Sequence, residues 1–184
     1  MRDSKYEPTL SASRPYPMES SLPNAQKTDR LSLPWDLSEW VEKDVLVRWL
    51  AEEIEGLDWA NPELIAYLQA HPNYHPKMLL SIVTYAYAIG VFESEEIVRA
   101  CYDDPIFRSI CTEAVPSAKA IARFRRDNRG LFKWSLAQLF RRSLKNKFAL
   151  GEVLLPVGLR RYLVDAAITR IDLARHMDRS AQGA

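Results

Sequence analysis

The sequence is poor in residues that build disulfide frameworks or cross membranes. It contains only two cysteines in 184 residues, Cys101 and Cys111, and both stand among apolar neighbours. We expect them to be small buried side chains in a reducing compartment. No apolar run approaches the roughly 20 residues that span a bilayer, and the first residues lack the basic-then-apolar order of a secretory signal. We therefore expect a cytoplasmic protein with no membrane partner.

Motifs that carry catalysis or bind ligands are also missing. The sequence has no Gly-rich phosphate loop and no Gly-x-Ser-x-Gly turn. His71 and His75 have the four-residue spacing of zinc ligands on a helix, but a proline follows each of them. A structural role, such as capping a helix, is the better interpretation. We expect no metal, no cofactor, no small-molecule substrate and no enzymatic activity.

What the sequence does contain is apolar residues at helical spacing. They make up 47% of the chain, which is enough for a core, and no segment shows the alternation of a strand. We predict an all-α fold, a compact helical bundle. Helix caps are expected at Asn61, Ser94, Asp104 and Ser117, with helix ends near Gly56 and Gly90. The expected helices cover residues 35–55, 61–72, 76–90, 94–103, 105–112, 117–127, 130–147 and 159–180.

Composition divides the chain into three parts. Residues 1–30 contain four prolines and no apolar period, so we expect a disordered tail. Residues 31–150 form the helical domain, and residues 151–184 form a C-terminal amphipathic helix. That helix has two apolar stripes, of which one packs on the domain. The other belongs either to the core or to a homodimer contact through residues 159–177. The stripes are Val164, Ala167, Ile168, Ile171 and Ala174, and Leu159, Tyr162, Leu163 and Ala166.

The net charge of +1 conceals a strong charge polarity along the chain. Residues 36–70 contain nine acidic side chains and two basic ones, whereas residues 116–147 contain ten basic side chains and a single acid, Asp127. Such asymmetry suggests a nucleic-acid or acidic partner for the basic segment. We expect double-stranded DNA as this partner, and a bacterial, nucleoid-associated protein. The alternative is that the acidic segment packs beside the basic one.

The order of the short helices favours DNA. Three of them, over 94–103, 105–112 and 117–127, have the cadence of a helix-turn-helix unit. On the third, Ile121 and Phe124 should face inward, while arginine side chains offer forks to phosphates and guanine edges. An ordinary solvated helix face is the alternative. Trp134 is expected in the core, with stacking on a base as its alternative. The candidate DNA-binding residues are Lys119, Arg123, Arg125, Arg126, Arg129, Lys133, Arg141, Arg142 and Lys145, with Lys147 as a further phosphate contact.

A family resemblance supports this interpretation. The stretch "YHPKMLLSIVTYAYAIGVFESEEIVRACYDDPIFRSIC", followed by a proline and "IARFRR", resembles the N-terminal domain of DDE-type insertion-sequence transposases. The resemblance covers roughly residues 31–145. It implies a helical DNA-binding domain that recognises transposon ends, with Lys119, Arg123, Arg125 and Arg126 at the DNA and Arg129 close by. Its most specific pieces are Tyr74-His75-Pro76, Met78-Leu79-Leu80, Tyr85-Ala86-Tyr87 with Gly90, Ser94, Ile97, Cys101, Asp104, Phe107-Arg108, and Ile121-Ala122-Arg123-Phe124-Arg125.

Two departures from the family pattern shape the functional expectation. Ser117-Ala118-Lys119-Ala120 replaces a polar run, which favours phosphate contact over base readout. A transposase also continues into a catalytic domain with three metal-binding acids. Here about 35 helical residues follow Lys147, and Asp165, Asp172 and Asp178 are expected on a solvated helix face. We expect a non-catalytic DNA-binding protein that regulates transcription or a related mobile element. The alternative is a protein-interaction module that kept the fold and lost DNA binding.

Overall fold

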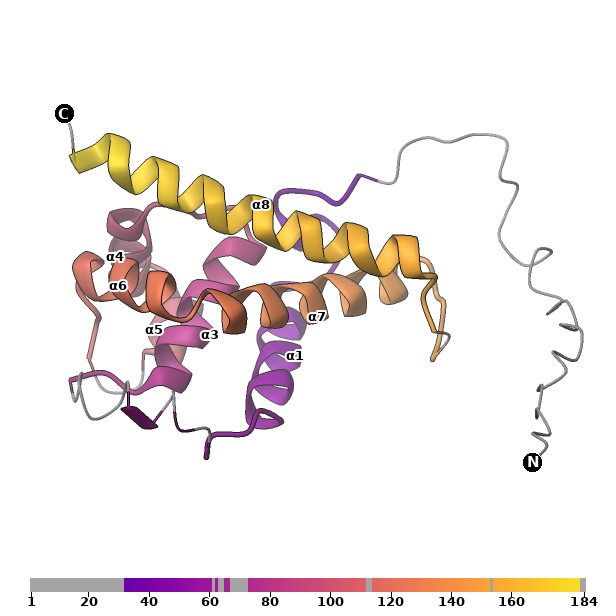
Figure 1. Cartoon of the computed structure of the whole chain (residues 1–184), viewed down its shortest axis with the longest axis horizontal. Helices are drawn as coiled ribbons and strands as arrows, with labels where there is room; N and C mark the ends of the chain where they lie inside the picture. The colour runs from indigo at the N-terminus through magenta and orange to yellow at the C-terminus, as the bar shows by residue number, and fades with distance from the viewer. Residues whose placement is uncertain are drawn as a thin grey trace, which may run out of the picture. The chain divides into compact units, whose positions relative to one another are not determined.

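The computed structural model describes residues 32–60, 62, 65–66, 73–111, 114–152 and 154–182. In this part of the chain every regular element is a helix, so the predicted all-α class is confirmed (Figure 1). The expected tail and most of the expected helix over 61–72 lie outside the described residues. The elements are η1 (Leu37–Glu39), α1 (Lys43–Glu55), α3 (Pro76–Ala88), α4 (Ser94–Asp103), α5 (Pro105–Ile110), α6 (Ala118–Asp127), α7 (Arg129–Lys147) and α8 (Val157–Gln182).

Helix α3 is the centre of the unit that begins at Leu33. Eleven of its thirteen side chains are buried, because α1, α7 and the three short helices α4, α5 and α6 all pack against it. His75 caps its first turn: the ring Nδ1 accepts a hydrogen bond from the Lys77 N–H at 3.2 Å. The predicted structural role of this histidine is therefore confirmed. Gly90 follows the helix with φ +83°, a conformation that favours glycine.

The three short helices form one packed group, with α4 in contact with both α5 and α6. Local side chains start two of them. The Asp104 carboxylate accepts from the Ile106 and Phe107 N–H groups at 2.7 and 3.2 Å, and Ser117 Oγ accepts from the Ala120 N–H at 3.2 Å. Both predicted caps are confirmed. The predicted Ser94 cap is wrong, because Ser94 is the first residue of α4 and its side chain bonds elsewhere.

The cores of the short helices are apolar, as their spacing predicts. Ile97, Phe107, Ile121 and Phe124 are fully buried or nearly so. Of the two cysteines, Cys101 is buried and Cys111 is half-buried, and both thiols are free.

Helices α6 and α7 are separated at Asn128 and not at Gly130. The Asn128 side-chain amide donates to the Phe124 carbonyl at 3.0 Å, which ends α6, and Gly130 lies inside α7. The Phe124 and Phe132 rings pack edge to face across the break with centroids 5.4 Å apart. Trp134 on α7 is 36% exposed, so its predicted place in the core is wrong.

Helix α8 turns back along α7 and packs against it (Figure 1). Its buried face takes Leu163 from one predicted apolar stripe and Ala167, Ile171 and Ala174 from the other, together with Arg170. The remaining members of both stripes are half-buried, so neither stripe is left wholly exposed. In the described part of the chain, no helix is long and apolar enough to cross a bilayer.

Arg170 holds α8 to the end of the central helix. Its side chain is only 2% exposed, and its guanidinium donates to the carbonyls of Tyr87 (2.6 Å), Ala88 (3.3 Å) and Pro34. Burial lowers the pKa of Arg170 to about 10, so the group remains charged at neutral pH. A cation here satisfies carbonyls at the C-terminus of α3 and complements the negative end of the helix dipole.

Replacing this buried arginine should destabilise the fold. We expect Arg170→Met to lower the free energy of unfolding by about 3 kcal/mol, because several buried carbonyls lose their donor. Urea unfolding measures the loss. Arg160→Met, at an exposed position on the same helix, should change stability by less than about 0.5 kcal/mol. Equal effects of the two substitutions would contradict the anchoring role.

Candidate nucleic-acid interface

Helix α6 separates an apolar inner face from a basic outer face. Ile121 and Phe124 on the inner face are fully buried. Lys119, Arg123 and Arg126 are exposed, and the last two side chains are 53% and 72% exposed. This is the orientation that the sequence predicts for these residues. Three cations thus project from a helix whose position is fixed by its other side.

The ion pairs on the outer face are few and weak. Asp127 is shared by two arginines, with an oxygen 3.1 Å from Arg126 Nε and another 3.7 Å from Arg123 Nε. Exposed pairs of this kind are worth about 0–1 kcal/mol, and salt screens them. One carboxylate also leaves two guanidinium groups with a net positive charge. An incoming anion can therefore displace Asp127 at little cost.

Arg125 does not belong to this outer face, which corrects the prediction that it contacts DNA. Its side chain is 6% exposed, with Nη1 2.7 Å from the Tyr87 hydroxyl and Nη2 2.5 Å from Asp178. Burial alone lowers the pKa of Arg125, but Tyr87 and Asp178 outweigh burial and the pKa is raised. Burial also raises the pKa of Tyr87 to about 12, so a neutral hydroxyl accepts the bond from a charged guanidinium.

Asp178 on α8 has partners on two other helices. Besides Arg125, its carboxylate accepts from the Ser94 backbone N–H at 2.9 Å and from the Ser94 hydroxyl at 2.7 Å. The carboxylate of α8 thereby caps α4, where a negative group is favourable. With a side chain only 10% exposed, Asp178 is not on a solvated face as predicted. It ties α8 to both α4 and α6.

Arg142 is also unavailable to DNA. Its guanidinium lies 2.6 Å from Glu52 and 3.3 Å from Glu53, donates to the Trp49 carbonyl at 3.3 Å, and lies over the Trp49 ring at 5.1 Å. At this position the acidic segment packs beside the basic one, as the alternative interpretation has it. These contacts disfavour the prediction that Arg142 grips a phosphate.

The remaining predicted residues of α7 are more accessible. Arg129, Lys133, Arg141 and Lys147 are exposed. Among them Arg129 pairs with Asp172 at 2.8 Å, and both of these side chains are nearly half exposed. Lys145 is half-buried and lies 3.8 Å from the exposed Glu152.

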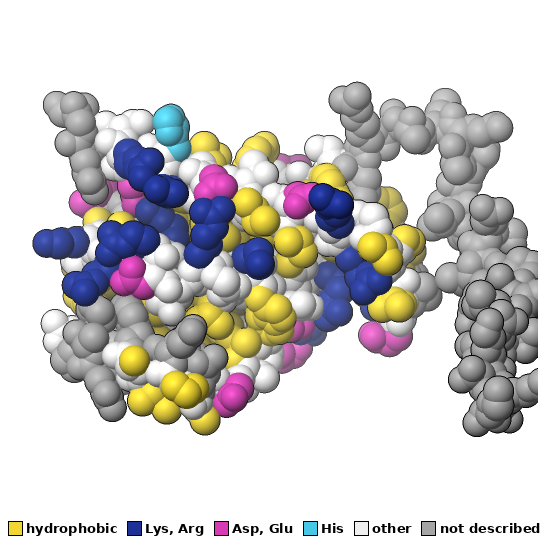
Figure 2. All heavy atoms as spheres, in the orientation of Figure 1, with side chains coloured by type: hydrophobic (Ala, Val, Ile, Leu, Met, Phe, Trp, Pro, Cys, Tyr) yellow, Lys and Arg dark blue, Asp and Glu magenta, His cyan; other side chains and the backbone are white. Residues whose placement is uncertain are grey.

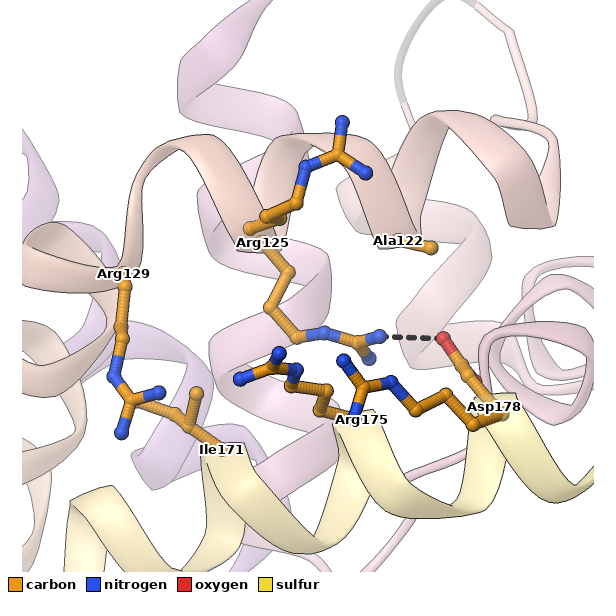
Figure 3. Close-up of a pocket in the computed structure, with 8 residues that line it drawn as sticks. Ala122, Arg125, Arg129, Ile171, Arg175 and Asp178 are labelled. Carbon is orange, nitrogen blue, oxygen red and sulfur yellow. Dashed lines mark hydrogen bonds and ion pairs between the residues drawn. The ribbon is translucent and has the colours of Figure 1, made fainter.

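The sequence interpretation missed two basic residues on α8. Arg175 and Arg179 are exposed, and together with Arg125, Arg126 and Arg129 they line a hollow of about 330 Å³ between α6 and α8 (Figure 3). Figure 2 shows Lys and Arg side chains gathered where α6 and the C-terminal half of α8 lie, with isolated acidic side chains among them. Their four-residue spacing places both arginines on one face of α8 and is a pattern that the sequence alone displays.

Metal ligands do not gather in the described part of the chain. No three His, Cys, Asp or Glu side chains lie together there as a set of ligands. The late aspartates are engaged separately: Asp165 lies 3.9 Å from Arg161, Asp172 pairs with Arg129, and Asp178 with Arg125.

Comparison with known proteins gives one match. A family model described as "Transposase domain (DUF772)" matches residues 35–127, about half of the chain. The matched segment begins before η1 and ends with the last residue of α6, so α7 and α8 follow it. No curated protein and no solved structure matches the chain.

Removing the shared carboxylate should loosen three helices at once. We expect Asp178→Ala to lower the free energy of unfolding by about 3 kcal/mol, because Arg125 is left as a buried charge without its ion-pair partner. Asp172 lies on the same helix as Asp178 and forms an exposed ion pair with Arg129. Asp172→Ala should therefore lower the free energy of unfolding by less than about 1 kcal/mol. Chemical denaturation of both variants makes the comparison, and a small loss for Asp178→Ala would show that the buried pair is not a support of the fold.

Proposed function

The chain belongs to the transposase domain (DUF772) family, and we propose that it binds double-stranded DNA through the outer face of α6 without catalysing strand transfer itself. One observation carries the proposal: α6 has a fully buried apolar side and a basic side that projects into solvent. The matched family segment includes the whole of this helix. Membership in a transposase family makes DNA the polyanion that this face would meet.

The arrangement suits a recognition helix in a helix-turn-helix unit. Helix α6 packs against α4 and α3, so two helices support the proposed recognition helix. The buried ion pair between Arg125 and Asp178 restrains the rotation of α6 about its own axis, because it holds the side of the helix that faces α8. Arg123 and Arg126 are then presented from a rigid element, and their planar forks match phosphate oxygens and guanine edges.

Phosphate contact is the larger part of the proposed interaction. Small side chains, Ala118, Ala120 and Ala122, stand beside the basic residues of α6 and offer no hydrogen bonds to base edges. The exposed residues Arg129, Lys133 and Arg141 on α7 provide further backbone anchors. Arg125 and Arg142 take no part, since both are held by carboxylates inside the chain.

The proposed role is regulatory. A DNA-binding protein of this family that does not cut would act on transcription or on a related mobile element, and a homodimer through residues 159–177 would supply two half-sites. The competing role, a protein-interaction module, would use the acidic first helix or the apolar stripes of α8. The acidic surface of α1 makes contacts within the chain, because Glu52 and Glu53 bind Arg142. The contacts therefore favour the DNA-binding role.

A salt titration of binding to random duplex DNA tests the proposal. Neutralising about six phosphates should give a slope of log affinity against log salt near −5. Arg123→Ala combined with Arg126→Ala should bring that slope about 2 units closer to zero and weaken binding at every salt concentration, because two phosphate contacts are lost.

The matched control removes two positive charges from another surface. Lys43 and Arg48 are exposed on α1, and Lys43→Ala with Arg48→Ala should leave the slope unchanged. Equal losses in the two double variants would mean that net charge alone drives binding. No binding by the wild-type chain at low salt would sink the proposal and favour the interaction module.

A further inference from the structure

The hollow between α6 and α8 carries more positive charge than the structure neutralises. Arg126 and Arg129 line it from one side, and Arg175 and Arg179 line it from α8. Figure 3 shows Arg129 and Arg175 on opposite sides of the hollow. Asp178, which lines the hollow, forms an ion pair with Arg125, and Asp172 forms an ion pair with Arg129. Within the described residues, neither Arg175 nor Arg179 has a carboxylate within ion-pair distance. We call this hollow the α6–α8 groove.

The spacing of the two α8 arginines is itself unfavourable. Residues four apart lie on the same face of a helix, and like charges at that spacing destabilise it slightly. Arg126 across the groove adds to the repulsion. An anion that enters the groove reduces the repulsion among these arginines, because each guanidinium then gains a charge-assisted hydrogen bond.

We propose that the α6–α8 groove binds phosphate groups, and that the phosphodiester backbone of DNA is their source. This inference rests on the proposed function. The volume of about 330 Å³ lies at the lower end of the range of small-ligand pockets, roughly 300–1,000 Å³. It suits a phosphate with part of its flanking sugars. Planar arginine forks can hold the oxygens of such a group two at a time.

Continuity with the outer face of α6 favours DNA over a free anion. Arg126 belongs to both surfaces: its side chain is 72% exposed on α6, and it also lines the groove. A polyanion on the outer face therefore passes the mouth of the groove, and its next phosphates can enter. Ala122 and Ile171 are the apolar lining residues, and neither can read a base. The groove thus adds affinity without sequence preference.

Two consequences follow for the roles of the helices. Helix α8 lies outside the segment that matches the family model, so a DNA contact from α8 extends the interface beyond the family domain. Asp178 acts as a positioning residue, because its bond to Arg125 sets how closely α8 approaches α6 at the groove. The C-terminal half of α8 then contributes to DNA binding itself.

Substituting the two α8 arginines tests the groove. Arg175→Ala with Arg179→Ala should bring the salt slope of binding to random duplex about 2 units closer to zero and lower the affinity by at least tenfold at low salt. Both residues are exposed, so the fold should survive, which circular dichroism and the melting temperature verify. Arg160→Ala with Arg161→Ala removes two charges from the same helix outside the groove and should leave the slope unchanged.

A second probe separates this inference from the proposed function. Inorganic pyrophosphate should raise the melting temperature of the wild-type chain but not that of the Arg175→Ala, Arg179→Ala variant. Wild-type DNA binding that the double variant fully retains would overturn the groove and leave the α6 proposal intact. Pyrophosphate stabilisation without DNA binding would overturn DNA as the source and, with it, the proposed function. No response to either probe would overturn both.

Discussion

The fold depends on one carboxylate that three helices share. Asp178 on α8 accepts hydrogen bonds from Ser94 at the start of α4 and from Arg125 on α6, and Arg125 in turn donates to Tyr87 on the central helix α3. Every charged or polar group in this network is buried or nearly so and has a partner, which is the condition under which buried polar networks specify one arrangement. The network joins α8 to both α4 and α6, and together with the buried side chains of Ile121 and Phe124 it determines which side of α6 faces solvent.

The arginines of the chain fall into two classes. Arg125, Arg142 and Arg170 are turned inward and hold carboxylates, carbonyls and aromatic rings. Others, such as Arg123 and Arg126 on α6, project outward with few acidic neighbours. A net charge of +1 therefore says little about the field at the surface, because several of the opposing charges cancel inside the molecule. The exposed arginines give this transposase-family chain the basic surface to which we assign DNA binding.

Much of the local structure could be predicted from the sequence, because its causes lie within a few residues. His75 with Pro76, Asp104 with Pro105, and Ser117 each begin a helix through bonds to the next two or three residues. The errors arise where the partner is distant. Ser94 and Arg125 bind a carboxylate 84 and 53 residues away, and Arg142 binds acids some 90 residues earlier. No periodicity reveals such a partner, so these arginines looked the same as the exposed ones.

In the proposed complex, the outward arginines of α6 bind the polyanion and the inward ones do not. A nuclear magnetic resonance titration of the full chain with a random DNA duplex, following arginine side-chain signals, distinguishes the two groups. We expect the signals of Arg123 and Arg126 to shift with added duplex while those of Arg125 and Arg142 stay in place. Shifts confined to the inward pair, or no shift at Arg123 and Arg126 under conditions where the duplex binds, would contradict it.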